Sequence, residues 1–294
     1  MPHFDPTQST PAAQDGADVA ARPAAARAAT STEQAAAGVF VTLEGVDGAG
    51  KTTQCALVCA GAAALGREVV RLREPGGTSI GERIRAILLD VGSAGMDPTC
   101  ELLLYEAARA QLVAQVIRPA LRRGAVVVSD RFFDSTCAYQ GHARGLGMGP
   151  VDAANRLACA DVAPTRTILL DIDPAAGLTR AAQADGGPDR LELEGVAFQQ
   201  RVRDGFAQVD AAEPIRVSTV DAVGSVEAVY ERVRAGLADI LPLPPYEQAR
   251  AQADAATPQP SPAPATHAHA VASSASQAAQ ADHATASEER PSHA

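Results

Sequence analysis

The segment at positions 45–52 constrains this chain more than any other part of its sequence. It reads G-V-D-G-A-G-K-T and matches the pattern G-x-x-x-x-G-K-[ST] in full. An apolar run at 39–43 precedes it and indicates a buried strand, and a helical pattern follows at 51–65. Glycines let such a loop curl until its N–H groups face one anion, and the helix N-terminus adds its positive dipole end. The strand–loop–helix setting favours a triphosphate-binding loop over the alternative, a plain glycine turn.

Two side chains of this loop have expected roles. Lys51 is placed for the β- and γ-phosphates of a nucleoside triphosphate, and the Thr52 hydroxyl is placed for a magnesium ion. The expected nucleotide-binding residues are Gly45, Val46, Asp47, Gly48, Ala49, Gly50, Lys51, Thr52 and Thr53.

Composition divides the 294 residues into three parts. Residues 1–37 are mostly Ala, Pro, Thr, Gln and Asp, and residues 242–294 are rich in Pro, Ala, Ser, Gln and His. Neither part has enough large aliphatic side chains to offset the entropy of ordering the chain, so both are predicted to be disordered tails. Residues 38–241 remain, which is a normal size for one α/β domain.

Charge, cysteine content and hydropathy argue against several classes of protein. A formal net charge of -10 disfavours a nucleic-acid binder, but it permits a nucleotide enzyme whose basic groups lie in one cleft. The odd count of 5 cysteines, without close C-x-x-C pairs, argues against a disulfide framework or a zinc site. The sequence shows no secretory leader pattern, and no run approaches the roughly 18 apolar residues of a membrane span. We therefore expect a cytoplasmic protein without a membrane or nucleic-acid partner.

Apolar runs alternate with helical patterns along the rest of the chain. The runs lie at 39–43, 68–72, 125–130, 167–172 and 215–219; helices are expected near 51–65, 80–90, 98–123, 151–159 and 225–241, with a glycine-rich loop at 141–150. Continuous apolar strands of this kind form a parallel sheet with helices on both faces. We predict an α/β protein with the three-layer fold of P-loop NTPases and a five-stranded parallel sheet. Its ligands should bind beyond the carboxyl ends of the strands.

Two features follow predicted strands and should reach that same edge. Asp130 and Arg131 close the third strand. The carboxylate suits a water-mediated contact to magnesium, and the guanidinium can clamp a phosphate with two hydrogen bonds. A surface ion pair is the alternative. The segment R-E-P-G-G-T at 73–78 follows the second strand and has no obvious packing purpose.

Two further segments suit the recognition of a nucleobase. The stretch at 131–141 is rich in aromatic and amide side chains, although its rings could equally belong to the core. Tyr105 and Arg109 lie four positions apart and therefore on one face of a helix. A ring at that place can stack on a base while the guanidinium bonds the edge of the base. The alternative for these two residues is a cation–π or core pair.

Together these residues resemble the thymidylate kinase family, whose members phosphorylate dTMP to dTDP. The resemblance rests on L-E-G-V-D-G-A-G-K-T-T at 43–53, R-E-P-G-G-T at 73–78, A-A-R at 107–109 and D-R-x-x-x-S-T-x-A-Y-Q-G at 130–141. It spans residues 39–241, and the tails have no counterpart in it. It implies ATP as the phosphoryl donor, Mg²⁺ as the cofactor, dTTP synthesis as the purpose, and a homodimer.

The resemblance also implies roles for individual residues. Tyr105 matches the aromatic residue that stacks on thymine, and Arg109 matches the arginine that reads the thymine edge. Asp47 matches the loop carboxylate that bonds the 3′-OH. The implied substrate-binding residues are Asp47, Glu74, Pro75, Arg85, Tyr105, Arg109, Arg131, Ser135, Thr136, Tyr139 and Gln140. Within this set Thr136 and Gln140 face the base, Tyr139 lies near the sugar, and Arg85, Arg131 and Glu74 belong to the acceptor-phosphate site. The implied metal-binding residues are Thr52 and Asp130.

The source of the catalytic arginine departs from the common pattern of the family. An arginine comes either from the phosphate loop or from a basic lid, and the loop of this chain supplies none. The lid should lie at 180–190, where only Arg180 and Arg190 stand among residues such as Ala182, Gln183 and Ala184. The hypothesis is that Arg190, with Arg180, covers the transferring phosphoryl group. The full set of expected catalytic residues is Lys51, Arg131, Arg190 and Arg180.

Two other interpretations compete with this one. The first is another small nucleoside or nucleotide kinase on the same scaffold, against which the 73–78 and 139–141 segments weigh. The second is a non-catalytic nucleotide-binding module whose tails recruit partners. The presence of Lys51, Thr52, Asp130 and Arg131 argues against that module.

Overall fold

The computed structural model describes residues 37–183, 187 and 189–256. All of them belong to one compact unit that begins at Ala37. The predictions for residues 1–36 and 257–294, and for residues 184–186 and 188 of the expected lid, lie outside the described residues.

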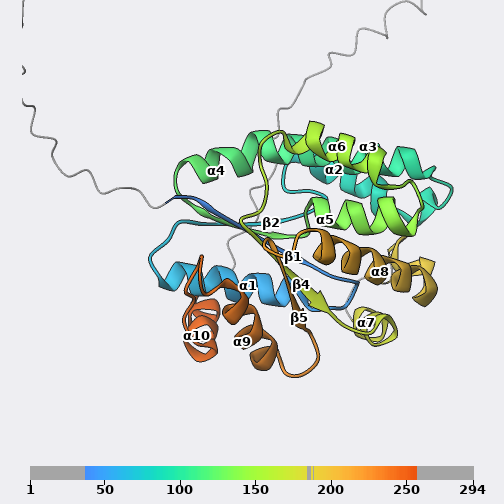
Figure 1. Cartoon of the computed structure of the whole chain (residues 1–294). Helices are drawn as coiled ribbons and strands as arrows, with labels where there is room; N and C mark the ends of the chain where they lie inside the picture. The colour runs from blue at the N-terminus through green and yellow to red at the C-terminus, as the bar shows by residue number, and fades with distance from the viewer. Residues whose placement is uncertain (1–36, 184–186, 188, 257–294) are drawn as a thin grey trace, which may run out of the picture. The chain divides into compact units, whose positions relative to one another are not determined.

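A parallel sheet forms the middle layer of this unit (Figure 1). Its strands are β1 (Val39–Glu44), β2 (Val69–Arg73), β3 (Val126–Asp130), β4 (Arg166–Asp171) and β5 (Val217–Asp221), in the spatial order β2-β3-β1-β4-β5. Every neighbouring pair is parallel. The predicted five-stranded parallel sheet is therefore confirmed, and the predicted strand positions are correct to within two residues.

Helices cover both faces of the sheet (Figure 1). On one face lie α2 (Ser79–Leu89), α3 (Pro98–Leu112), α4 (Arg118–Arg122) and α6 (Met148–Cys159), and on the other α1 (Lys51–Ala64), α9 (Val226–Leu237) and α10 (Tyr246–Ala255). The remaining helices are α5 (Phe133–Thr136), α7 (Pro174–Ala181), α8 (Val196–Ala212) and the short turns η1 (Val91–Ser93) and η4 (Glu192–Glu194).

Alternating side chains of the strands fill two cores, one on each face. Val41 and Leu43 of β1 belong to the core that also contains residues of α1, α8 and α9. Phe40, the residue just before Val41, belongs to the core under α3 and α4. Because a strand points successive side chains to opposite faces, a continuous apolar run is required when both faces are buried.

Two helical segments differ from the sequence prediction. Residues 98–123, expected as one helix, contain a π-helical turn at Val113–Ile117 between α3 and α4. The loop expected at 141–150 is wrong at both ends, because helical structure continues through the π-helix Cys137–Ala143 (η3) and α6 begins at Met148. A Cβ added at Gly141 would lie 3.0 Å from the Met148 sulfur, so this glycine permits close packing within a helix and does not start a loop.

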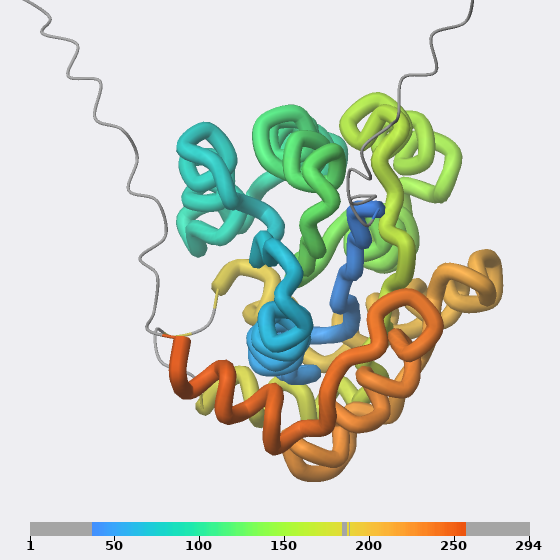
Figure 2. Tube along the Cα trace, turned by 90° about the vertical axis from the view of Figure 1, so that its left-hand side faces the viewer, coloured from blue at the N-terminus to red at the C-terminus, as the bar shows by residue number. Residues whose placement is uncertain are grey.

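The C-terminal boundary predicted at residue 241 is also wrong, because residues 246–255 form helix α10. Tyr246 packs against Tyr230 of α9 with ring centroids 6.0 Å apart, and its backbone N–H donates to Glu231 at 2.9 Å. Figure 2 shows α10 running beside α1, the helix that follows the triphosphate-binding loop. Only a few side chains of residues 242–255 are buried, among them Leu243, Tyr246 and Ala249. The Pro- and Ala-rich composition around them gives no hydrophobic pattern from which a helix could be predicted.

We predict that Tyr246→Ala lowers the free energy of unfolding by about 3 kcal/mol, because it removes a buried aromatic ring from the contact between α10 and α9. Chemical denaturation of the full chain measures this change. The matched variant Tyr246→Phe keeps the ring and loses only the hydroxyl that accepts from Arg250, so it should cost less than about 1 kcal/mol. Equal stability of Tyr246→Ala and the parent would contradict the packing role of α10.

Candidate active site

The carboxyl ends of β1, β2 and β3 bring three of the predicted segments together. The strand register places Leu43 of β1 and Arg73 of β2 on either side of Asp130. Beyond the strand ends, the Glu74 N–H donates to the Asp130 carbonyl at 2.9 Å, and the Arg131 N–H donates to the Leu43 carbonyl at 3.0 Å. The triphosphate-binding loop, the 73–78 segment and the Asp130–Arg131 pair therefore share one edge of the sheet.

The glycines of the triphosphate-binding loop are required by its geometry. Gly45 has φ 138° and Gly48 has φ 73°, both in the region that disfavours side chains. A Cβ at Gly45 would lie 2.4 Å from the Leu170 carbonyl oxygen, and one at Gly48 would lie 1.9 Å from the Gly177 carbonyl oxygen. Neither position can carry a side chain without displacing β4 or α7.

Lys51 lies at the first turn of α1 with its amine folded over the loop. Its Nζ donates to the Gly45 carbonyl at 3.0 Å and to the Val46 carbonyl at 2.7 Å. Burial, with a smaller contribution from the positive charge of Arg131, lowers the pKa of Lys51 to about 8. The amine is therefore charged at neutral pH and close to losing its proton in mild alkali.

The two predicted metal-binding residues lie in contact. The Thr52 hydroxyl donates to Asp130 Oδ2 at 2.6 Å, although the residues are 78 positions apart in the sequence. Mg²⁺ takes oxygen ligands, and in nucleotide sites it uses one or two protein oxygens and fills its shell with phosphate and water. The donor set of this pair fits that requirement.

Arg131 is the most connected of the predicted substrate-binding residues. One guanidinium nitrogen donates to Asp47 at 2.5 Å and to the Tyr139 hydroxyl at 3.0 Å. The other donates to the Ser135 hydroxyl at 3.0 Å and to the Gly45 carbonyl at 3.1 Å. Burial alone would lower the pKa of Arg131, but Tyr139, Asp47 and other acidic neighbours outweigh it and raise the pKa. This arginine thus joins the triphosphate-binding loop to the segment after β3.

A partner of Asp47 lies in a helix far away in the sequence and was not predicted. Gln199 of α8 is fully buried, and its amide donates to Asp47 Oδ2 at 2.6 Å. The two residues are 152 positions apart, and a single Gln in an amphipathic helix carries no signal of its own. Asp47 is therefore held on both carboxylate oxygens, by Arg131 and by Gln199.

Arg109 reaches the 73–78 segment in a buried cluster of charges. Its guanidinium, 1% exposed, pairs with Glu74 at 2.8 Å and with Glu106, and it donates to Asn155 at 3.1 Å. It also lies 5.4 Å from the centre of the Phe132 ring, so the cation–π contact considered above exists, but with Phe132 in place of Tyr105. Burial raises the pKa of Glu74 to about 7, although Arg109 opposes this rise.

Other residues of the predicted site surround this cluster. The Arg85 side chain donates to the Pro75 carbonyl at 2.9 Å, which fixes it on the 73–78 segment. Tyr105 is half-buried on α3, one turn before Arg109. Thr136 is buried, and its hydroxyl oxygen has no hydrogen-bond partner among the described residues. A buried polar atom of this kind fits a position that faces a ligand.

Glu101 of α3 is a second residue of this site that the sequence did not predict. It is fully buried and accepts hydrogen bonds from Gln140 at 2.7 Å and from Arg144 at 3.2 Å. It also pairs with Arg190 at 2.6 Å. Burial acts to raise the pKa of Glu101, but these donors outweigh burial and lower it. The carboxylate fixes Gln140, one of the two residues expected to face a base.

The expected lid arginines do not lie together. Arg190 is 4% exposed, paired with Glu101, and its Nε donates to the Leu88 carbonyl at 2.8 Å. Arg180 of α7 donates to the Ala222 carbonyl at 3.3 Å, at the end of β5. The structure thus places Arg190 beside Glu101, which also bonds Gln140, and Arg180 beside the loop after β5.

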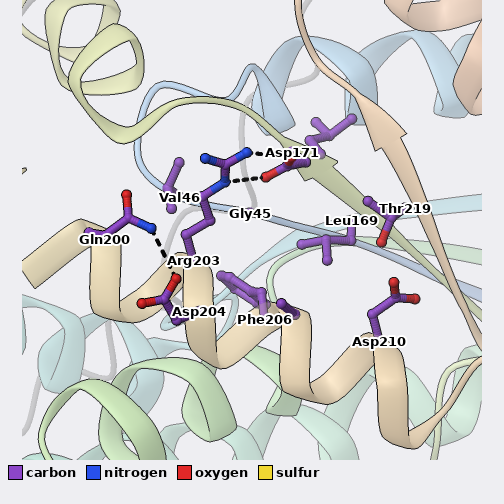
Figure 3. Close-up of a pocket in the computed structure, with 12 residues that line it drawn as sticks. Gly45, Val46, Leu169, Asp171, Gln200, Arg203, Asp204, Phe206, Asp210 and Thr219 are labelled. Atoms are coloured by element: carbon purple, nitrogen blue, oxygen red, sulfur yellow. Dashed lines mark hydrogen bonds and ion pairs between the residues drawn. The ribbon is translucent and has the colours of Figure 1, made fainter.

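A separate cavity of about 310 Å³ lies between α8, β4 and β5 and reaches Gly45 and Val46 (Figure 3). Arg203 of α8 spans it and forms two hydrogen bonds, both of 2.7 Å, with Asp171 of β4. Apart from Gly45 and Val46, the predicted site residues do not line this cavity.

We predict that nucleotide binding by the free protein weakens as pH rises through about 8, the pKa of Lys51. The pKa is lowered, so the amine is charged below this value and neutral above it, where it attracts phosphate less. The affinity should fall by up to about tenfold per pH unit. Calorimetric titration with a non-hydrolysable ATP analogue between pH 7 and 9 measures it. Lys51→Arg stays charged and should bind with little pH dependence; an equal slope in both proteins would refute the assignment.

Comparison with known proteins agrees with this geometry. The family model described as thymidylate kinase matches residues 43–233. The chain is 51% identical over 204 residues to a thymidylate kinase of Solidesulfovibrio magneticus, covering 66% of this chain and 96% of that protein. It is 46% identical over 203 residues to a thymidylate kinase of Pelobacter propionicus, covering 67% and 93%.

A solved structure supports the same assignment. The crystal structure of thymidylate kinase from Ehrlichia chaffeensis aligns with a TM-score of 0.54 and 33% sequence identity, covering 68% of this chain and 99% of that chain. Within the part of the chain that the structure describes, no helix combines the length and the apolar character that crossing a membrane requires. The chain belongs to the thymidylate kinase family, whose members are nucleoside monophosphate kinases.

Proposed function

We propose that this chain transfers the γ-phosphoryl group of ATP to the 5′-phosphate of dTMP, giving dTDP for dTTP synthesis, and that Arg131 orients the acceptor phosphate. The observation that carries the proposal is the position of Arg131, whose guanidinium contacts the triphosphate-binding loop at Gly45 and Asp47 and the base-facing segment at Ser135 and Tyr139. One side chain therefore touches both the donor-binding and the acceptor-binding parts of the site.

The chemistry requires positioning and charge neutralisation more than proton transfer. The nucleophile is a phosphate oxygen of dTMP, which is mostly dianionic at pH 7 because the second pKa of a phosphate monoester is about 6. No general base is needed. Lys51 and the loop N–H groups hold the phosphates of ATP, and Arg131 sets the acceptor oxygen in line with them.

The proposed cofactor is Mg²⁺, held by the Thr52 hydroxyl and, through water, by Asp130. When bound, it would neutralise charge on the phosphates of ATP. The 2.6 Å hydrogen bond between the two side chains supports this assignment, because it sets both oxygens at the start of α1 beside Lys51.

We propose that Tyr105 stacks on thymine and that Thr136 and Gln140 face its edge. The orphaned Thr136 hydroxyl and the fixed Gln140 amide support this arrangement. Arg109 can still read the base edge, because its NH2 group carries two N–H bonds and contacts only Glu74 among the described residues. In the same proposal Asp47, held by Gln199, accepts from the 3′-OH of the sugar.

Offering the purified protein ATP and Mg²⁺ with dTMP, dUMP, dCMP, dAMP or thymidine tests the function. We expect dTMP to be preferred by at least about tenfold in kcat/KM, since a site that fits the methyl group and the polar edge of thymine disfavours bases that lack either. Chelation of Mg²⁺ should abolish turnover. Preference for another acceptor would indicate a different kinase on the same fold, and ATP binding without any turnover would indicate a binding module.

The catalytic role proposed for Arg190 requires its guanidinium to leave Glu101. If Arg190 covers the transferring phosphoryl group, Arg190→Ala should lower kcat by about 100-fold to 1,000-fold and change the KM for dTMP little. If Arg190 only holds Glu101, and through it Gln140, in position, the same variant should raise the KM for dTMP and change kcat little. Steady-state kinetics of Arg190→Ala and Arg180→Ala side by side separate these outcomes, and an unchanged kcat in the first would refute the catalytic role.

We further propose that the chain forms a homodimer through α2, α3 and α6. Ile87 of α2, Leu103 of α3 and Leu157 of α6 are 49%, 60% and 86% exposed on the layer that these helices share. Such exposed apolar groups fit an interface between subunits. Light scattering should give twice the mass of one chain, and Leu157→Asp should shift the protein to the monomer; a monomeric parent would contradict the proposal.

We also propose that the protein acts in the cytoplasm. All 5 cysteines are free thiols, which fits a reducing compartment.

A further inference from the structure

The backbone of Arg131 is held in a conformation that side chains disfavour. Its φ is 74°, and among the described residues Ala160 is the other non-glycine residue with positive φ. Such a conformation persists only where the surroundings enforce it. In Arg131 this conformation turns the chain sharply after β3, so the contacts that enforce it decide where the guanidinium lies.

The Arg131 carbonyl accepts from the Ser129 hydroxyl at 2.7 Å, and Glu44, the last residue of β1, holds the turn from its other side. It is fully buried, and Oε1 accepts from the N–H of Phe132, the residue after Arg131, at 2.6 Å. Its Oε2 accepts from the Ser135 hydroxyl at 2.6 Å. Ser135 in turn accepts from the Arg131 guanidinium at 3.0 Å. One carboxyl group therefore holds the backbone of the turn with one oxygen and, through Ser135, the guanidinium with the other.

We propose that Glu44 is a positioning residue for phosphoryl transfer, which sets the turn and the guanidinium of Arg131 against the acceptor phosphate. The inference rests on the role proposed above for Arg131. It assigns to Glu44 no contact with either nucleotide.

A purely structural role explains these contacts less well. Desolvation of a fully buried carboxyl group costs free energy that its hydrogen bonds only offset, so a contribution to stability alone does not favour Glu44 over an apolar residue. The neighbouring buried carboxylate, Asp134, has its own arginine, because Arg216 donates to both of its oxygens at 2.7 and 2.8 Å. Among the residues that the structure describes, no guanidinium bonds Glu44, and both of its oxygens contact the segment after Arg131.

The protonation of Glu44 helps to choose the variant that tests this role. Burial, followed by repulsion from Asp134, raises the pKa of Glu44 to about 8, so the group is mostly neutral at pH 7. A neutral carboxyl group and an amide share a shape, with one accepting and one donating atom. In the neutral group the protonated oxygen donates to the Ser135 oxygen, and in Glu44→Gln the amide NH2 can do the same while the amide oxygen accepts from the Phe132 N–H. Glu44→Ala loses both bonds.

The experiment measures steady-state kinetics of Glu44→Ala and Glu44→Gln, alone and in an Arg131→Ala background. We expect Glu44→Ala to lower kcat/KM for dTMP by roughly 10-fold to 100-fold, as a misplaced catalytic contact does, and to leave the KM for ATP within about twofold. Glu44→Gln should recover most of the activity. In the Arg131→Ala background, Glu44→Ala should cost less than about twofold more, because the residue through which it acts is gone.

A matched control lies two positions earlier on the same face of β1. Thr42 is also fully buried, and its hydroxyl contacts Thr167 at 2.7 Å without touching the Arg131 turn. Thr42→Val should lower the Tm without changing the KM for dTMP. If Glu44→Ala does not fold, Glu44→Asp replaces it in the experiment. Its side chain is one methylene shorter and cannot reach both Phe132 and Ser135, so we expect the same loss of kcat/KM for dTMP.

The outcomes distinguish the inference from the function on which it rests. Full additivity of Glu44→Ala and Arg131→Ala, or a fall in Tm without a change in kinetics, would overturn the positioning role and leave the function of Arg131 intact. Unchanged dTMP kinetics in Arg131→Ala alone would overturn both.

Discussion

The ion pair between Arg131 and Asp47 is the interaction on which the geometry of the site depends. It ties the end of β3 to the loop after β1 at 2.5 Å, and both side chains are 17% exposed. An ion pair that is this buried adds little net stability, because desolvation of the two charges offsets much of their attraction. Removing one partner, however, leaves an uncompensated charge and costs about 3 kcal/mol or more. Its contribution is therefore geometric: it fixes the distance between the triphosphate-binding loop and Arg131.

Other parts of the site show the same arrangement, in which a buried carboxylate forms an ion pair with one or two arginines. Glu74 forms an ion pair with Arg109, and Asp134 forms one with Arg216. Glu101 pairs with both Arg144 and Arg190. Each pair joins elements that are distant in the sequence, so each pair sets the position of one helix or loop relative to another. The net negative charge of the chain is compatible with these buried arginines, because each of them is neutralised locally by a carboxylate.

The parts of the fold that depend on local pattern could be predicted from the sequence, and the parts that depend on tertiary contact could not. The strands and the triphosphate-binding loop are local: the apolar runs are continuous, and Gly45 and Gly48 are required by their own backbone angles. Thr52 and Asp130 could be paired because both follow strands of one parallel sheet. The roles of Tyr105 and Arg109 came from the resemblance to a family.

Gln199, Glu101 and α10 show what such reasoning misses. Gln199 meets Asp47 across 152 positions, and nothing near it in the sequence indicates a partner. Glu101 resembles any acidic residue in the first turn of a helix until the fold buries it beneath Arg144 and Arg190. Helix α10 depends on a few buried side chains that pack on α1 and α9, and a composition rich in Pro, Ala and Gln gives no sign of them.

A crystal structure of the protein with dTMP and a non-hydrolysable ATP analogue tests the central claim most directly. The account predicts that the Arg131 guanidinium bonds the 5′-phosphate of dTMP while its backbone keeps the left-handed conformation seen here. It also predicts that Lys51 leaves the Gly45 and Val46 carbonyls for the phosphates of the analogue. An acceptor phosphate bound away from Arg131, with the Arg131–Asp47 pair undisturbed, would contradict the account.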